Sequence, residues 1–219
     1  MSRALDAGDT VTAFVRDEDR LADVTLSRLN VYVGNVCDAR DLKEILPGHD
    51  LFISTLGPRT PTKAACTIYS KSAVAIVKAM QECGVKRLLV TSTALLFPSD
   101  RLLGRFLRFV ARHNARNAGL MEQTICASSL EWTIARLGFL NDKNSMDFRL
   151  AEGAFPDGGS ISRAAVASFL LSEAKKSKYL YKVVGLYGKK HITKACDLRY
   201  ASTRNSQRLT SSISCGHTE

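Results

Sequence analysis

The chain has 219 residues, of which 45% are hydrophobic, so it holds enough apolar material for one sizeable core and too little for a second full domain. Its formal net charge is +10, but the basic residues are scattered and only 7% of residues are aromatic, which does not indicate a nucleic-acid-binding face. No run approaches the roughly 18 apolar residues of a membrane span, and the first residues lack the apolar stretch of a signal peptide. We therefore expect a cytoplasmic protein with neither a nucleic-acid nor a membrane partner.

The six cysteines show no ligand spacing of the C-x-x-C kind. Free thiols in a reducing compartment are the simplest interpretation, and we expect no metal site.

Short apolar runs alternate with helical patterns along residues 1–188, which is typical of repeated β-α units and a parallel sheet. The expected strands are TVTAFV (10–15), NVYVG (30–34), LFIST (51–55), RLLVTS (87–92), EWTIAR (131–136) and YKVVGL (181–186). The expected helices span 39–46, 68–83, 117–128 and 163–175, the last with Ser162 as its N-cap. Residues 189–219 lose this periodicity and carry a net charge of +4, so we expect a basic, mostly disordered tail after a domain of residues 1–188.

The first expected strand ends in an arginine. In a doubly wound sheet the ligand lies beyond the carboxyl ends of the strands, and Arg16 ends this strand with Arg20 one helical turn later. Two guanidiniums there would match the 2'-phosphate of NADP. A solvated surface pair balanced by Asp17, Glu18 and Asp19 is the alternative.

The next strand ends carry polar and turn-forming residues. Asn35 and Val36 are candidates to frame an adenine, the amide at its polar edge and the valine at its face, whereas Asp38 more simply caps the following helix. Gly57 and Pro58 form a turn whose backbone could approach a ribose or pyrophosphate closely, or an ordinary strand-to-helix turn.

Two hydroxyl groups end the fourth strand. Ser92 and Thr93 are candidates to bond a nicotinamide carboxamide or a substrate, although hydroxyl groups are common at strand ends.

Taken in order, the segments VTAFVRDEDRL, GNVCDARDL, STLGPR, VTSTALL, SSLEWTIARLGFL and ISRAAVASFLL resemble the atypical short-chain dehydrogenase/reductases. The branch they resemble is the NAD(P)H-binding group of flavin/biliverdin reductase-like and NmrA-like proteins. The resemblance implies a Rossmann-type doubly wound parallel sheet and NADP as cofactor. It implies NADP bound through Arg16 and Arg20, adenine near Asn35 and Val36, ribose and phosphates near Leu56, Gly57, Pro58 and Arg59, and nicotinamide beside Ser92 and Thr93.

The chain departs from this family at its start. The family opens with a strand and a glycine-rich loop, and neither is visible here, so we expect the sheet to lack its first, central strand, between runs 10–15 and 51–55. A fragment, a splice form and a wrongly started gene model all stay open. Asn35 stands where an aspartate is usual, and RLG (136–138) where Arg-Pro-Gly is common.

The expected activity follows from a second departure. None of the six tyrosines is followed by a lysine four residues later, so the proton-donor pair of standard short-chain dehydrogenases is missing. This fits hydride transfer from NADPH to a flavin or similar planar small-molecule acceptor, which can take its proton from water. His113 and Glu122 are further titratable candidates, interpreted here as helix-surface residues. The alternatives are a non-catalytic NADP-sensing regulator with protein partners and an inactive truncated isoform.

Overall fold

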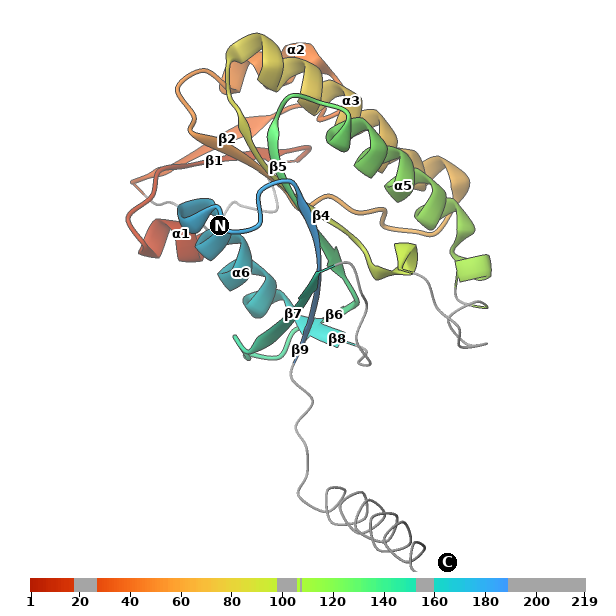
Figure 1. Ribbon diagram of the computed structural model, residues 1–219. Coiled ribbons are helices and arrows are strands. Elements are labelled where there is room, and N and C mark those ends of the chain that lie inside the picture. The colour runs from red at the N-terminus through yellow and green to blue at the C-terminus, as the bar shows by residue number, and fades with distance from the viewer. Residues whose placement is uncertain (18–26, 98–105, 107, 153–159, 189–219) are drawn as a thin grey trace, which may run out of the picture. The chain divides into compact units, whose positions relative to one another are not determined.

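The computed structural model describes residues 1–17, 27–97, 106, 108–152 and 160–188. These residues form a mixed α/β fold with mainly parallel strands, as the sequence predicts. Helices α2, α3 and α5 cover one face of the sheet, with α3 and α5 side by side, and α6 covers the other face (Figure 1). This is the layered arrangement of a doubly wound fold.

The larger sheet has five strands in the order β3 (Leu51–Ser54), β4 (Arg87–Thr93), β5 (Glu131–Leu137), β9 (Lys182–Gly188) and β7 (Phe148–Glu152). The first four are parallel, and β7 pairs antiparallel with β9 at the edge. β4 is buried over almost its whole length, as expected of an apolar run covered by helices on both faces. A smaller sheet pairs the short strands β6 (Phe139–Asn141) and β8 (Ser160–Ser162).

A separate two-stranded sheet pairs β1 (Val11–Val15) with β2 (Leu29–Val33) in parallel. Within the described residues β1 has no strand partner other than β2, and β3 none other than β4. The sheet is thus divided between β1 and β3, where the sequence predicts an absent central strand. All five residues of β1 are only half-buried, unlike those of β4. That a further strand belongs in this gap stays a prediction.

The helices are α1 (Ser2–Asp6), α2 (Ala39–Ile45), α3 (Lys63–Cys83), the 3-10 helix η2 (Ala94–Leu96), α5 (Arg112–Cys126) and α6 (Arg163–Lys176). Two predicted N-caps, at Asp38 and Ser162, are confirmed, and a glycine ends α3. The side chains of Asp38 and Ser162 accept hydrogen bonds from N–H groups in the first turns of α2 and α6, and Gly84 ends α3 at φ 75°.

Two helices begin earlier than predicted, and α1, η2 and three strands were not predicted. α3 begins earlier than residue 68 because the Thr62 hydroxyl caps it by accepting from the Ala65 N–H, and α5 begins before residue 117. Strands β6, β7 and β8 were not predicted: β6 and β8 have three residues each, and β7 shows no full alternation of apolar and polar side chains.

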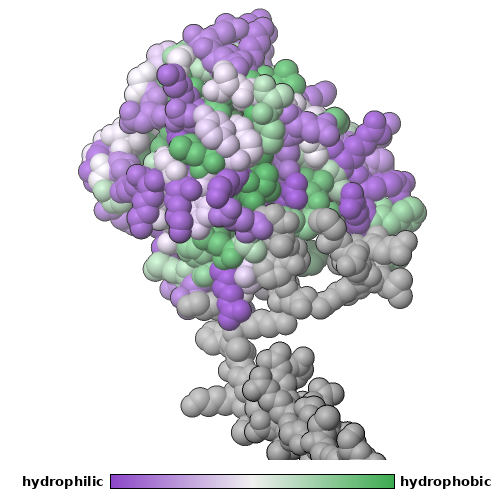
Figure 2. Space-filling model, viewed as in Figure 1, coloured by the Kyte–Doolittle hydropathy of each residue, from purple (hydrophilic) through white to green (hydrophobic). Residues whose placement is uncertain are grey.

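Two apolar cores lie on the two faces of the five-stranded sheet. One joins the sheet to α2, α3 and α5 through residues such as Leu42, Met80 and Ile134, and the other joins it to α6 through Phe169 and Leu186. On the face shown in Figure 2 hydrophilic side chains predominate, and smaller apolar areas lie between them. The four cysteines in the described segments are free thiols.

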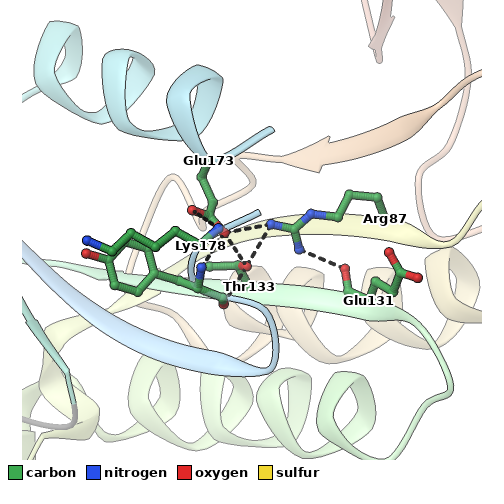
Figure 3. Close-up of polar contacts among 6 residues, drawn as sticks. Arg87, Glu131, Thr133, Glu173 and Lys178 are labelled. Atoms are coloured by element: carbon green, nitrogen blue, oxygen red, sulfur yellow. Dashed lines mark hydrogen bonds and ion pairs between the residues drawn. The ribbon is translucent and has the colours of Figure 1, made fainter. Parts of the chain in front are cut away.

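A buried ion pair ties α6 to the amino ends of β4 and β5 (Figure 3). The Arg87 guanidinium donates to the carboxylate of Glu173 on α6 at 2.9 Å and to the Thr133 hydroxyl at 2.9 Å. The same carboxylate accepts from the backbone N–H groups of Lys178 and Tyr179, at 3.2 and 2.8 Å. Burial lowers the pKa of Arg87, while the charge of Glu173 raises it. Glu173 therefore fixes the α6–β9 turn as well as pairing the arginine.

We predict that Glu173→Gln lowers the free energy of unfolding by about 3–5 kcal/mol, because it leaves a buried arginine without its counter-charge. The matched control is Glu152→Gln, which breaks the exposed Glu152–Lys182 pair and should cost at most about 1 kcal/mol. Urea unfolding followed by circular dichroism measures both. Equal losses in the two variants would show that the buried pair has no special role.

Candidate functional site

The parallel strands bring most of the predicted site residues to one edge of the fold. β1 to β5 all run parallel to a neighbour within their sheets, and the carboxyl ends of β3, β4 and β5 meet at one edge of the larger sheet. Ligands of doubly wound folds bind at such an edge.

Arg16 follows β1 directly and is exposed, whereas Arg20 lies outside the described residues. The positive charges of Lys71 and Arg16 both act to lower the pKa of the Cys37 thiol, although burial, the larger effect, raises it. Arg16 and Lys71 therefore both act electrostatically on Cys37, which follows β2. Lys71 was not among the predicted site residues, and its place on α3, far along the chain, explains why.

The segment after β2 forms a tight turn. The Asn35 side-chain oxygen accepts from the Cys37 N–H at 3.1 Å, and the Asn35 N–H donates to Asp41 at 2.7 Å. Asn35 is exposed, while Val36 is 6% exposed and packs in the core. The described contacts give Asn35 a turn-forming role, and its predicted contact with an adenine, like that of Val36, stays a prediction.

The segment after β3 carries the predicted ribose and phosphate contacts. Leu56 packs against the core, and Gly57, Pro58 and Arg59 lie in the connection to α3. A Cβ atom at Gly57 would meet the Tyr69 hydroxyl at 3.6 Å, an ordinary contact, and the backbone there needs no positive φ. The fold alone therefore does not require glycine at this position.

At the end of β4, Ser92 is buried and its hydroxyl donates to the Glu122 carboxylate on α5 at 2.6 Å. Thr93 is half-buried and its hydroxyl accepts from the Leu95 N–H at 3.3 Å, which caps η2. Because an ionised carboxylate can only accept, the Ser92 oxygen keeps its lone pairs for a donor.

Glu122 is the residue that the sequence interpretation placed wrongly. It was expected on the helix surface, but it is 6% exposed, and its carboxylate pairs with Arg136 on β5 at 2.7 Å. The Arg136 guanidinium also lies over the Phe97 ring, 4.6 Å from its centroid. Glu122 falls on the apolar stripe of α5 with Ala118, Met121 and Ile125, a signal that could have revealed its burial.

His113, the other titratable candidate, is half-buried in the first turn of α5, and its backbone carbonyl accepts from Asn117. In the described segments no group of three or more histidine, cysteine or acidic side chains is placed to hold a metal ion. No helix in those segments is long and apolar enough to cross a membrane.

Residues 1–177 match the sequence model of a family described as NAD(P)H-binding. The chain belongs to this NAD(P)H-binding family. The predicted cofactor, NADP, is therefore of the class that the family binds.

Solved structures share the fold at low sequence identity. A Rossmann-fold NAD(P)-binding family protein from Shigella flexneri is 21% identical with a TM-score of 0.70, and the match covers 86% of each chain. A short-chain dehydrogenase/reductase from Veillonella parvula in complex with NADP is 17% identical with a TM-score of 0.70, covering 87% of this chain and 88% of that one. An oxidoreductase from Lactococcus lactis is 14% identical with a TM-score of 0.67, covering 95% and 89%. These similarities confirm the predicted Rossmann-type fold.

The Ser92–Glu122–Arg136 arrangement makes a prediction about energetic coupling. In a double-mutant cycle of Ser92→Ala and Glu122→Gln, the two losses of unfolding free energy should be non-additive by about 0.5–3 kcal/mol, because the groups share a buried bond. Urea unfolding of the four proteins measures the coupling. A control cycle of Ser92→Ala with Glu82→Gln, whose carboxylate pairs with Lys43 on the surface, should be additive. Coupling no larger than in the control would refute the network.

Proposed function

We propose that the chain is an NADPH-dependent reductase of the flavin/biliverdin reductase-like branch, acting on a flavin or similar planar acceptor. The observation that carries this proposal is the Ser92–Glu122–Arg136 arrangement at the end of β4 and β5. Because the Ser92 hydroxyl donates a hydrogen bond to Glu122, its oxygen is left to accept a hydrogen bond. The amide N–H of a nicotinamide carboxamide is a suitable donor. Arg16 and Lys71 supply positive charge for a phosphate at the end of β1.

The choice of NADP over NAD rests on the end of β1. Arg16 is exposed and carries a fork of donors that matches a phosphate, and Arg20 follows it in the sequence. An acidic residue at the strand end would instead accept from the ribose hydroxyls of NAD. Asp17 comes one residue later, so the arginine itself holds the strand-end position.

The part of the proposed site that would hold the pyrophosphate needs one more strand and loop. Among the described residues, β1 pairs only with β2, and β3 only with β4. We propose that the complete binding site includes a strand there, followed by a glycine-rich loop whose N–H groups hold the pyrophosphate.

The reaction needs few protein groups. A bound NADPH would supply the hydride, and the acceptor would take this hydride together with one proton from water. The residues would act mainly by positioning: Ser92 and Thr93 orient the nicotinamide, while the Glu122–Arg136 pair holds Ser92 in place. A lysine four residues after a tyrosine is absent from the sequence, which is compatible with such an acceptor.

A non-catalytic NADP-sensing regulator that binds protein partners is the second candidate. It would use the same cofactor site and also needs no tyrosine–lysine pair. Steady-state oxidation of NADPH with FMN as acceptor, in a chain completed with a strand and a glycine-rich loop, separates the two. Turnover supports the reductase, and tight NADPH binding without turnover supports the regulator.

For cofactor choice, we predict that the completed chain binds NADPH more tightly than NADH and that Arg16→Ala removes most of this preference. A charge-assisted contact of about 1.5–3 kcal/mol corresponds to roughly tenfold to a hundredfold in affinity. Titration by nucleotide fluorescence measures both dissociation constants. Arg149→Ala, on the exposed edge strand β7, is the control and should leave the ratio unchanged. Equal affinities for the two nucleotides would exclude the assignment.

For the chain of 219 residues itself, we predict poor NADPH binding and lower stability than in the completed form, because the pyrophosphate N–H groups and a strand partner are lacking. The same titration, together with thermal unfolding, provides the comparison. Micromolar NADPH binding by the present chain would contradict this prediction.

A further inference from the structure

A basic and apolar surface lies where the chain enters α5. Residues 106 and 108–110 are helical and lead through residue 111 into Arg112, the first residue of α5. Phe106, Phe109 and Val110 are 61%, 66% and 54% exposed, and Arg108 and Arg112 are exposed beside them in the sequence. We refer to these five residues as the Arg-Phe surface. Large apolar side chains grouped at the surface are a common mark of an interaction site.

The basic side chains of this segment lie on both sides of the turn at residue 111. Arg108 precedes the turn, whereas Arg112 and Arg116 are four residues apart on α5, and all three are exposed. Arg101 and Arg105, further upstream in the sequence, lie outside the described residues. No aspartate or glutamate occurs between Arg101 and Glu122, so the sequence offers these arginines no acidic partner within the segment.

The apolar side chains follow the same helical period. Phe106, Phe109 and Val110 stand at positions i, i+3 and i+4, which places them on one side of a helix. The Arg112 guanidinium lies 5.3 Å from the centroid of the Phe109 ring, so the basic and apolar sides adjoin. The segment is thus amphipathic, with arginines beside exposed aromatic rings.

We propose that the Arg-Phe surface binds peripherally to a bilayer that contains anionic lipids. Phenylalanine and valine would enter the boundary between headgroups and acyl chains, and the arginines would contact lipid phosphates. A nucleic acid would use the arginines but would leave Val110 without a partner, and an acidic protein would need a matching apolar groove. The proposal replaces the expectation, drawn from composition, that the protein has no membrane partner, and it is independent of the proposed reductase activity.

The test is sedimentation of the full chain with vesicles of phosphatidylcholine, with and without phosphatidylserine. We expect binding only to the anionic vesicles, weakened by added salt. Phe109→Ser should weaken this binding roughly tenfold or more. A phenylalanine side chain that becomes largely buried in the bilayer contributes at least about 1.4 kcal/mol to binding. Phe139→Ser is the matched control, since Phe139 is 67% exposed but lies on β6, and it should bind as the unmodified chain does.

A second pair of variants distinguishes membrane binding by this surface from a general effect of the positive charge elsewhere, including the basic residues of 189–219. Arg108→Glu with Arg112→Glu should also weaken binding roughly tenfold or more, whereas Arg149→Glu with Lys176→Glu, which changes charge equally elsewhere, should not. Circular dichroism confirms that the variants fold. The proposal is overturned if both charge variants weaken binding equally, if Phe109→Ser has no effect, or if the chain binds a single-stranded oligonucleotide but no anionic vesicle.

Discussion

The hydrogen-bonding requirement of the strand backbone is the constraint on which the rest of this structure depends. Every backbone N–H and C=O group in a sheet needs a partner, and β4, β5 and β9 satisfy theirs on both edges. β1 and β3 each have one partner strand among the described residues, and their other edges are free. The division leaves the β1–β2 pair attached mainly through packing of Phe14 and α2 on the core and a 2.9 Å contact between Thr12 and His49.

The same constraint decides which part of the site is well formed. The carboxyl ends of β4 and β5 belong to paired, buried strands, and Ser92, Glu122 and Arg136 are held there in a fixed arrangement. At the carboxyl end of β1, Arg16 follows a half-buried strand that has one partner among the described residues. The proposed nicotinamide end of the site is therefore rigid, while the proposed phosphate end depends on what fills the gap beside β1.

Much of this could be predicted from the sequence, because strands and helices follow local patterns. Strands β1 to β5 and β9 and the Asp38 and Ser162 caps could be predicted from apolar runs and single residues. The apolar stripe of α5 could have revealed that Glu122 is buried, but it could not reveal its partner, because Arg136 lies fourteen residues away on β5. The buried Arg87–Glu173 pair was missed for the same reason, since its members are distant in sequence and meet only through packing.

The most direct measurement of the divided sheet is residue-resolved amide hydrogen exchange along β1. The Val11 N–H and the Val15 carbonyl point toward the β2 side, and because successive residues alternate, the N–H groups of Thr12 and Phe14 point to the free edge. If the sheet is divided, the amides of Thr12 and Phe14 should exchange at least about tenfold faster than those of Ala13 and Val15, since they lack hydrogen bonds. Equal protection along all of β1 would contradict it.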